Sequence, residues 1–309
     1  MNEKGFIAQL REMVTHPAAR GLLDDAALLE VGGARLIITH DMLVEGVHFL
    51  PDDPAESVAW KLLAVNLSDL AAKGVRPAGA VMAYTLVGQT ALAETGWDAA
   101  FVAGLGAALA HFGVPLIGGD TVLGTERSLG MTLIGEAIGA VPSRAGAMEG
   151  DALFVTGTIG DAGLGLALAR AGRSEPEALL EAYRRPQPQL AAGKRLAPKV
   201  SAMMDISDGL LLDVLRMTEA SGVSAIIDLD AVPLSAAASL EAGDGRAARL
   251  AAATAGDDYQ LLFTSSLPLP PLPCPVTRIG QIVRGAGVHV HDRDGAVPLP
   301  AQLGWLHGS

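Results

Sequence analysis

The chain has 309 residues, enough for two domains that each bury a hydrophobic core. Half of the residues are apolar, yet no run of them approaches the ~20 residues that a membrane-spanning helix needs, so we expect no membrane segment. The formal net charge of −12 would repel a phosphate backbone, which argues against a nucleic-acid partner.

Two further features favour a cytoplasmic protein. Cys274 is the single cysteine of the sequence, which excludes an intramolecular disulfide framework and a metal site built on several cysteines. Residues 1–5 show no basic region followed by an apolar stretch, so we expect no signal peptide.

The first half of the sequence predicts a mixture of helices and strands. Apolar residues at helical spacing predict a helix over 3–14 that ends before Pro17. The segment 53–56 resembles a capping box with proline at the first helical position, and predicts a helix that runs to Lys73 and stops at Gly74. The other predicted elements are a hairpin of strands 27–31 and 36–39, a strand over 78–87, a helix over 97–112, a buried strand over 114–117 that leads into Gly118, and a strand over 129–138.

The pattern breaks around residues 142–150, and we place the domain boundary there, with an N-terminal domain over 1–141 and a C-terminal domain over 142–309. Neither half alternates strand and helix strictly, which favours an α+β fold with mixed sheets. The elements predicted in the second half are strand 152–156, a glycine-rich turn over 157–165 that enters a helix, two further helical segments, strand 202–206, helix 210–221, strand 224–229, a helix ending near Ala255, and strands 259–264 and 276–283, which close the sheet.

Aspartates recur in one setting along the chain, at or within apolar stretches and beside glycine, serine or threonine. Burying a carboxylate without a cation or a hydrogen-bond donor is costly, and few lysines and arginines lie nearby in sequence. A shared polyvalent ligand explains the set, and hard oxygen ligands suit Mg²⁺ held together with substrate phosphates. The aspartates are Asp24 and Asp25, Asp41, Asp69, Asp120, Asp205 and Asp208, and Asp257 and Asp258.

For any single aspartate the alternative is a turn or capping residue. Asp208, which precedes Gly209, is equally suited to cap a helix that starts at Leu210. This alternative is weakest for Asp69, because an aspartate in the middle of a helix gains nothing from capping.

The turn over 157–165 has the composition of a phosphate cradle, but a tight strand-to-helix turn is the simpler interpretation.

The sequence contains, in this order, the segments Asp24–Ala27, Thr39–Phe49, Asn66–Ala72 with Gly74, Leu116–Thr121, Asp205–Leu210 and Gly256–Tyr259. Together these segments resemble thiamine-monophosphate kinases. The resemblance implies the PurM-like fold of the AIR-synthetase superfamily, in which an N-terminal domain dimerises through its sheet and a C-terminal α/β domain closes over the nucleotide. It runs from about residue 20 to Trp305 and covers most of the chain.

The resemblance also implies a set of site residues. Its positions for several Mg²⁺ ions fall on Asp25, Thr39, Asp41, Asp69, Asp120, Asp205 and Asp208. Its ATP contacts fall on Gly119, Arg144 and Ser207, and its contacts with thiamine monophosphate fall on His48, Asp257 and Trp305. Three positions depart from the family pattern: His40 replaces a hydroxyl residue beside the metals, Asp257 is one methylene shorter than the usual glutamate, and Leu22 and Leu23 follow Gly21 where the family has Ile-Gly.

The resemblance implies a homodimeric enzyme that phosphorylates thiamine monophosphate to thiamine diphosphate with ATP. We expect direct in-line transfer without a residue that acts as nucleophile or general base, because the acceptor is itself a phosphate and metal ions stabilise the charge. AIR synthetases remain an alternative within the superfamily, whereas selenophosphate synthetases and hydrogenase-maturation enzymes act through cysteines at positions where this sequence has none. A non-catalytic nucleotide-binding protein is the alternative of another class, but aspartates clustered without a metal would repel one another.

Overall fold

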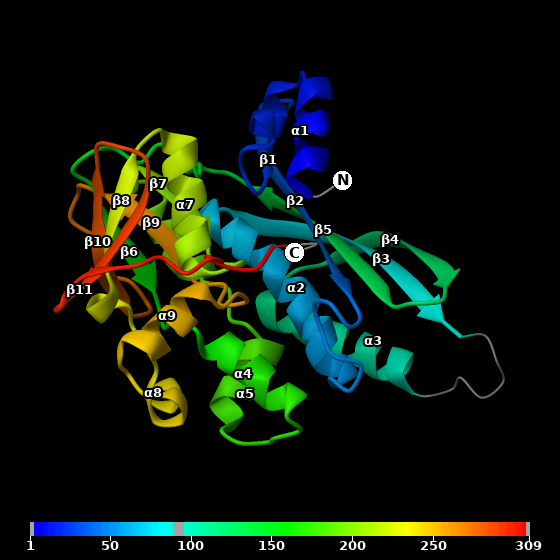
Figure 1. The fold of residues 1–309 in the computed structure, drawn as a ribbon. Coiled ribbons are helices and arrows are strands. Elements are labelled where there is room, and N and C mark those ends of the chain that lie inside the picture. Colours follow the sequence, from blue (N-terminus) through cyan, green and yellow to red (C-terminus); the bar gives the residue numbers. More distant parts are fainter. Residues whose placement is uncertain (1–2, 89–95, 307–309) are drawn as a thin grey trace.

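The computed structural model describes residues 3–88 and 96–306, so Met1 and Asn2 of the segment considered for a signal peptide lie outside it. The chain forms two β-sheets, one from each half, and helices pack against both (Figure 1). Within the described residues, no helix is long and apolar enough to cross a membrane. The mixture of helices with two mixed sheets agrees with the α+β fold expected from the sequence.

The first sheet has five strands in the order β1-β2-β5-β3-β4. Neighbouring strands pair antiparallel except β3 and β4, which run parallel and are connected through α3. Helices α2 and α3 pack against this sheet around the fully buried Leu62, Phe101 and Met131. The elements are α1 (Glu3–Met13), the 3₁₀ helix η1 (Pro17–Leu22), β1 (Ala27–Val31), β2 (Ala34–Val44), α2 (Ala55–Ala72), β3 (Arg76–Val87), α3 (Trp97–Phe112), β4 (Leu116–Gly124) and β5 (Ser128–Glu136).

Strand β4 shows that the prediction of a buried strand over 114–117 is wrong. The strand lies at the edge of the sheet, and all nine of its residues are exposed. The strand also continues through its glycines. A Cβ at Gly119 would lie 2.3 Å from the carbonyl oxygen of Met82 on β3, so only glycine allows the two strands to approach this closely. The large apolar side chains that β4 exposes are Leu116, Ile117, Val122 and Leu123.

Helix α2 contributes to the cores of both halves of the molecule. Its Leu62 packs in the core of the first sheet, whereas Ala71 and Ala72 pack in a separate cluster with residues of α6, β7 and β9. The backbones of α2 and α6 touch closely, since a Cβ at Gly193 would lie 1.9 Å from the carbonyl oxygen of Ala71. The helix therefore fixes the first sheet relative to the second.

The capping box expected at the start of α2 is wrong. Pro54 occupies the N-cap position, and no side chain caps the helix. Asp53 instead accepts hydrogen bonds from the backbone N–H of Leu50 (2.8 Å) and from the hydroxyl of Tyr183 (2.8 Å). Tyr183 lies on α5, so this aspartate joins the two halves of the chain rather than starting a helix.

The second sheet has seven strands in the order β12-β11-β8-β10-β6-β9-β7. After it, the C-terminal segment runs back toward α2 and the first sheet (Figure 1), and the backbone N–H of Trp305 donates to the carbonyl oxygen of Asp208 (2.8 Å). The elements are β6 (Ala152–Thr156), α4 (Asp161–Arg170), α5 (Glu177–Arg184), α6 (Leu190–Leu196), β7 (Ala202–Asp205), α7 (Leu210–Ser221), β8 (Ser224–Asp228), the 3₁₀ helix η2 (Leu229–Ala231), α8 (Ala236–Ala242), α9 (Arg246–Thr254), β9 (Leu261–Ser265), β10 (Val276–Val283), β11 (Gly287–Asp292) and β12 (Gly295–Val297).

The sequence suggested that the strand over 276–283 completes the second sheet, but β11 and β12 follow it and belong to the same sheet. Strands β11 and β12 form an antiparallel pair, and β11 pairs parallel with β8. In β11 the buried Val288 and Val290 alternate with the exposed His289 and His291, which is the pattern of a half-buried strand.

Candidate active site

A cavity of about 730 Å³ lies between the two halves of the chain. The first half lines it with the segment before β1, with β2 and the turn that follows, and with α2. The second half lines it with α4, with the segments that follow β7 and α9, and with the C-terminal segment. The predicted site residues in its lining are Asp25, Asp41, His48, Asp69, Asp205, Ser207, Asp208, Asp257 and Trp305.

Three carboxylates gather in the wall of this cavity. Asp25 precedes β1, Asp69 lies in α2 and Asp205 ends β7, and one oxygen from each lies within 4.8 Å of the other two. Asp25 Oδ2 is buried and accepts no hydrogen bond from any described residue. An oxygen-only ligand set with one oxygen left without a donor fits a hard cation such as Mg²⁺.

Burial and mutual repulsion raise the pKa values of Asp41, Asp69 and Asp205 above their ordinary range. Burial and the charge of Asp25 raise the pKa of Asp205 to about 8. Burial and the charges of Asp25 and Asp208 raise the pKa of Asp41 to about 6, and burial with Asp41 and Asp205 raises the pKa of Asp69 well above its usual range. A bound cation would reverse this effect, because it favours the ionised form of each group.

Thr39 and Asp41 lie on the same face of β2, as alternate residues of a strand do. The hydroxyl of the buried Thr39 donates to the Asp69 carboxylate behind the cavity wall, and the backbone N–H of Asp41 donates to Asn66 Oδ1 (2.9 Å). The side chain of His40 points to the other face, where its Nδ1 lies 2.8 Å from Thr132 Oγ1. Thr39 and Asp41 thus adjoin the cluster, and the imidazole of His40 does not.

Cationic side chains compensate the cluster on its protein side. Arg144 donates to Asp25, and Lys73 Nζ, which is paired with Asp24, lies 3.6 Å from Asp25 Oδ2. Burial would raise the pKa of Asp24, but Lys73 and Arg20 outweigh it and lower that pKa to about 2. Asp24 is therefore held by cationic side chains and not left for a metal. Arg144 contacts Asp25 but is not among the described residues that line the cavity.

The turn after β7 is held by side chains of α7. Asp213 accepts hydrogen bonds from the backbone N–H groups of Ser207 (3.1 Å) and Asp208 (3.2 Å). Arg216 donates to Asp208 Oδ2 (2.6 Å) and to Asp213 Oδ1 (2.9 Å). Gly209 is the N-cap of α7 and no side chain caps this helix, so the capping alternative for Asp208 is wrong.

The residues predicted to bind thiamine monophosphate line the same cavity from three segments. His48 follows β2, and its Nδ1 accepts the backbone N–H of Val44 (3.1 Å). Asp257 lies between α9 and β9 with a left-handed φ of 68°, which is uncommon for a residue other than glycine. Trp305 comes from the C-terminal segment, lines the cavity and is 49% exposed.

Gly119 and Asp120 lie apart from the other predicted residues. In the sheet, Asp41 pairs with Met131, Met131 with Met82, and Met82 with Gly119. Three strand spacings separate β2 from β4, which is about 14 Å. Within one chain, the structure therefore does not bring Gly119 and Asp120 to the carboxylate cluster.

Sequence reasoning missed the basic residues that hold the site. Lys61 and Lys73 are buried in and after α2, and Arg216 lies on α7. Lys61 lies between apolar residues within α2 and Lys73 directly follows the helix, which was the available signal. Arg216 lies eight residues after Asp208, and no sequence pattern marks that pair.

The glycine-rich turn over 157–165 is a strand-to-helix turn, as the simpler interpretation held. Both carboxylate oxygens of Asp258 accept the backbone N–H of Gly160 (2.9 and 3.0 Å), the group that a phosphate cradle would use.

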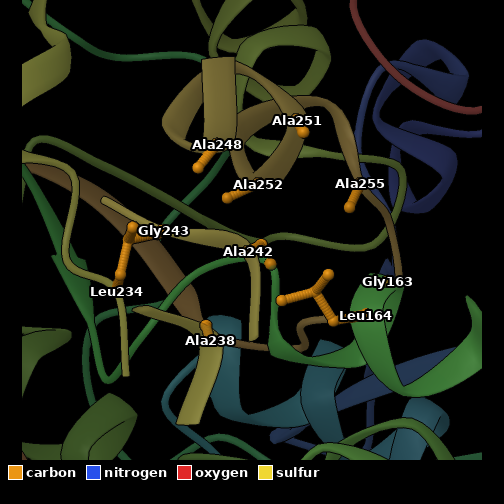
Figure 2. A pocket seen from close by; sticks show the side chains of 11 residues that line it. Gly163, Leu164, Leu234, Ala238, Ala242, Gly243, Ala248, Ala251, Ala252 and Ala255 are labelled. Carbon is orange, nitrogen blue, oxygen red and sulfur yellow. The ribbon is translucent and has the colours of Figure 1, made fainter. Parts of the chain in front are cut away.

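Beside this turn, a second cavity of about 190 Å³ lies between α4, α8 and α9 (Figure 2). Only glycine, alanine and leucine residues line it in the described structure, so it offers no side chain for catalysis.

Two family models match the chain. AIR synthase related protein, N-terminal domain, matches residues 23–141, and the C-terminal domain of the same group matches residues 148–265. These two regions contain the first sheet and most of the second sheet, respectively.

Curated relatives and solved structures identify a narrower group. Thiamine-monophosphate kinase of Caulobacter vibrioides is 37% identical over 99% of this chain and 91% of its own length. The enzyme of Escherichia coli K12 is also 37% identical, over 92% of this chain and 90% of its own. A solved structure, AaThiL complexed with AMPPCP and TMP, has a TM-score of 0.89 and 31% identity over 99% of this chain and 97% of that one. The chain therefore belongs to the thiamine-monophosphate kinase family of the AIR-synthase-related proteins.

Proposed function

We propose that the protein transfers the γ-phosphoryl group of ATP to thiamine monophosphate in the cytoplasm, giving thiamine diphosphate and ADP. The observation that carries the proposal is the cavity that joins the carboxylate cluster to His48, Asp257 and Trp305. Family membership supports the choice of donor and acceptor, because a related structure at 31% identity is described with AMPPCP and TMP.

Several Mg²⁺ ions, when bound, would supply charge neutralisation for the phosphates and for the transferred group. Asp25, Asp69 and Asp205 are the central ligands in this proposal, since their oxygens already converge. Asp41 and Asp208 extend the ligand set along the cavity, and Thr39 supports it through Asp69. Asp208 would exchange its contact with Arg216 for the cation.

The side chains of the site bind and orient, and none forms a covalent intermediate. Arg144 is placed to hold an ATP phosphate when Asp25 takes a metal, because a guanidinium matches phosphate with two parallel hydrogen bonds. Ser207 presents its hydroxyl from a turn that Asp213 fixes. An oxygen of the acceptor phosphate then attacks the γ-phosphorus while the bond to the bridging oxygen of the β-phosphate breaks, and ADP leaves.

The thiamine end occupies the part of the cavity lined by His48, Asp257 and Trp305 in this proposal. Asp257 faces the cationic ligand with a carboxylate, and the indole of Trp305 attracts a cation through its ring face.

We infer that the protein acts as a homodimer formed through β4. This edge strand exposes unpaired backbone and large apolar side chains, and a second copy would cover both. Because three strand spacings, about 14 Å, separate β4 from β2 in the same sheet, Asp120 serves the cavity of the partner subunit in this proposal. Gly119 contacts ATP at the same place.

Mixing two inactive variants tests this arrangement. Asp120→Asn and Asp205→Asn each remove one contribution to every site, whereas a mixed dimer keeps one intact site of two. Unfolding and refolding an equal mixture should restore about a quarter of the wild-type activity, since half of the dimers are mixed. Activity no higher than that of the separate variants would show that Asp120 and Asp205 act within one chain.

A coupled assay tests the function itself. Purified protein is incubated with ATP, Mg²⁺ and thiamine monophosphate, and thiamine diphosphate and ADP are quantified by chromatography. Equal amounts of the two products are expected. ATP hydrolysis without thiamine diphosphate would favour another superfamily reaction, and the absence of both products would favour a non-catalytic nucleotide-binding protein.

A further inference from the structure

Lys61 is a buried lysine beneath the acceptor end of the cavity. It lies on α2, is 2% exposed, and is absent from the cavity lining in the described part of the chain. A lysine ammonium is seldom buried unless it is paired, so its partners show what its charge is used for.

The partners of Lys61 come from three separate segments. Its Nζ donates to Asp257 Oδ2 (2.7 Å) and to the carbonyl oxygen of His48 (3.1 Å). The same ammonium lies 4.1 Å from the centre of the Tyr183 ring, a cation–π contact. Lys61 therefore ties together the turn after β2 and the segment between α9 and β9, the two places that provide His48 and Asp257.

The carboxylate of Asp257 is held on both sides. Lys61 engages Oδ2, and the hydroxyl of Tyr259 donates to Oδ1 (3.1 Å). The backbone N–H of Asp257 donates to the carbonyl oxygen of Ser207 (2.7 Å), which fixes the left-handed residue itself. A carboxylate accepts about four hydrogen bonds, so about two lone pairs remain for a ligand in the cavity.

We propose that Lys61 is the positioning residue of the acceptor site. It sets the separation of His48 and Asp257 and orients the Asp257 carboxylate so that its remaining lone pairs face the thiamine end. It also offsets part of the charge of Asp257, so the carboxylate recognises the ligand through directed hydrogen bonds as well as through charge. The assignment rests on the proposed kinase function, and it concerns acceptor binding and leaves ATP binding aside.

A double-mutant cycle tests the proposal. Lys61→Met keeps an unbranched side chain, one heavy atom shorter, without charge or donor, and Asp257→Asn keeps the shape of the carboxylate without its charge. Lys61→Met should raise the KM for thiamine monophosphate about tenfold, the scale of one charged hydrogen bond, with kcat and the KM for ATP within about twofold. In the Asp257→Asn background the same change should alter that KM by less than about threefold.

A purely structural role would give a different result. Lys61→Met would then raise the acceptor KM by the same factor in both backgrounds, or would affect both substrates alike, and either result overturns the proposal. An unchanged acceptor KM in Lys61→Met overturns it as well. Lys194→Met, on the exposed surface of α6, is the matched control and should behave as wild type.

Two measurements keep the outcomes apart. Wild-type turnover is recorded first, because its absence refutes the kinase function, whereas an active wild type with an unaffected Lys61→Met refutes the positioning role alone. Circular dichroism verifies that each variant is folded. Where Lys61→Met is unfolded, Lys61→Gln, which keeps a donor without the charge, enters the same cycle and is judged by the same outcomes.

Discussion

Replacing Asp205 with asparagine is expected to stabilise the metal-free protein while it abolishes catalysis. Asp205 is buried, and burial together with the charge of Asp25 raises its pKa from 3.8 to about 8. Between these values the folded protein holds a proton that the unfolded chain has released, so stability falls as the pH rises from 3.8 towards 8. At pH 7 the cost is roughly 4 kcal/mol.

Asparagine keeps the shape of aspartate but cannot ionise, so it removes this cost. Because neighbouring carboxylates share the repulsion, one substitution relieves part of it, about 1–3 kcal/mol, and raises Tm by about 2–5 °C. Thermal unfolding followed by circular dichroism at pH 7 in EDTA measures the gain. Addition of Mg²⁺ should stabilise the wild type and have little effect on Asp205→Asn, because the variant lacks a ligand.

Asp213→Asn is the matched control, and we expect it to lower Tm where Asp205→Asn raises it. Asp213 is as deeply buried, and burial raises its pKa to about 7. Its oxygens, however, accept hydrogen bonds from Ser207, Asp208 and Arg216, and asparagine cannot replace the ion pair with Arg216. This variant should melt below the wild type. The reasoning fails if Asp205→Asn also melts below the wild type in EDTA, or if it responds fully to Mg²⁺.

Three other outcomes are expected. Trp305→Ala should raise the KM for thiamine monophosphate about 5–30-fold in steady-state assays with the KM for ATP nearly unchanged, whereas a lower Tm with both KM values intact would make Trp305 a packing residue. Chelation should abolish product formation and Mg²⁺ should restore it; full activity in excess EDTA would contradict the oxygen-ligand site. Free thiamine should not be phosphorylated, because the acceptor phosphate is needed to hold the nucleophile at the metals, and chromatography showing equal rates on thiamine and its monophosphate would disprove this.

Secondary structure could be predicted where local sequence signals mark the ends of an element. The helices over 97–112 and 210–221 and the strand over 152–156 match α3, α7 and β6 in their bounds. Both helices end at a glycine in the left-handed conformation, which is a signal that the sequence carries. Burial could not be predicted in this way for 114–117, because an apolar run does not reveal whether another element covers it.

The same difference holds for the candidate site: residues that belong to a local motif could be predicted, and residues whose partners depend on the tertiary structure could not. Asp25, Asp69 and Asp205 were all predicted from motifs, and the structure brings them together. The residues that position the site were missed, because their partners are set by tertiary structure. Lys61 and Asp257, for example, are separated by 196 positions in the chain, and only the packing of α2 against the second half makes them neighbours.

The shared helix α2 has a consequence for how ligands enter. Since Leu62 is buried in one core and Ala71 in another, the halves cannot swing apart about a hinge without exposing apolar surface on both sides of the helix. A cut near residue 141 would leave each fragment with half of an interface, although family models recognise the two regions separately. We therefore expect access to the cavity to depend on small movements of its rim, such as the C-terminal segment that carries Trp305, and not on separation of the two halves.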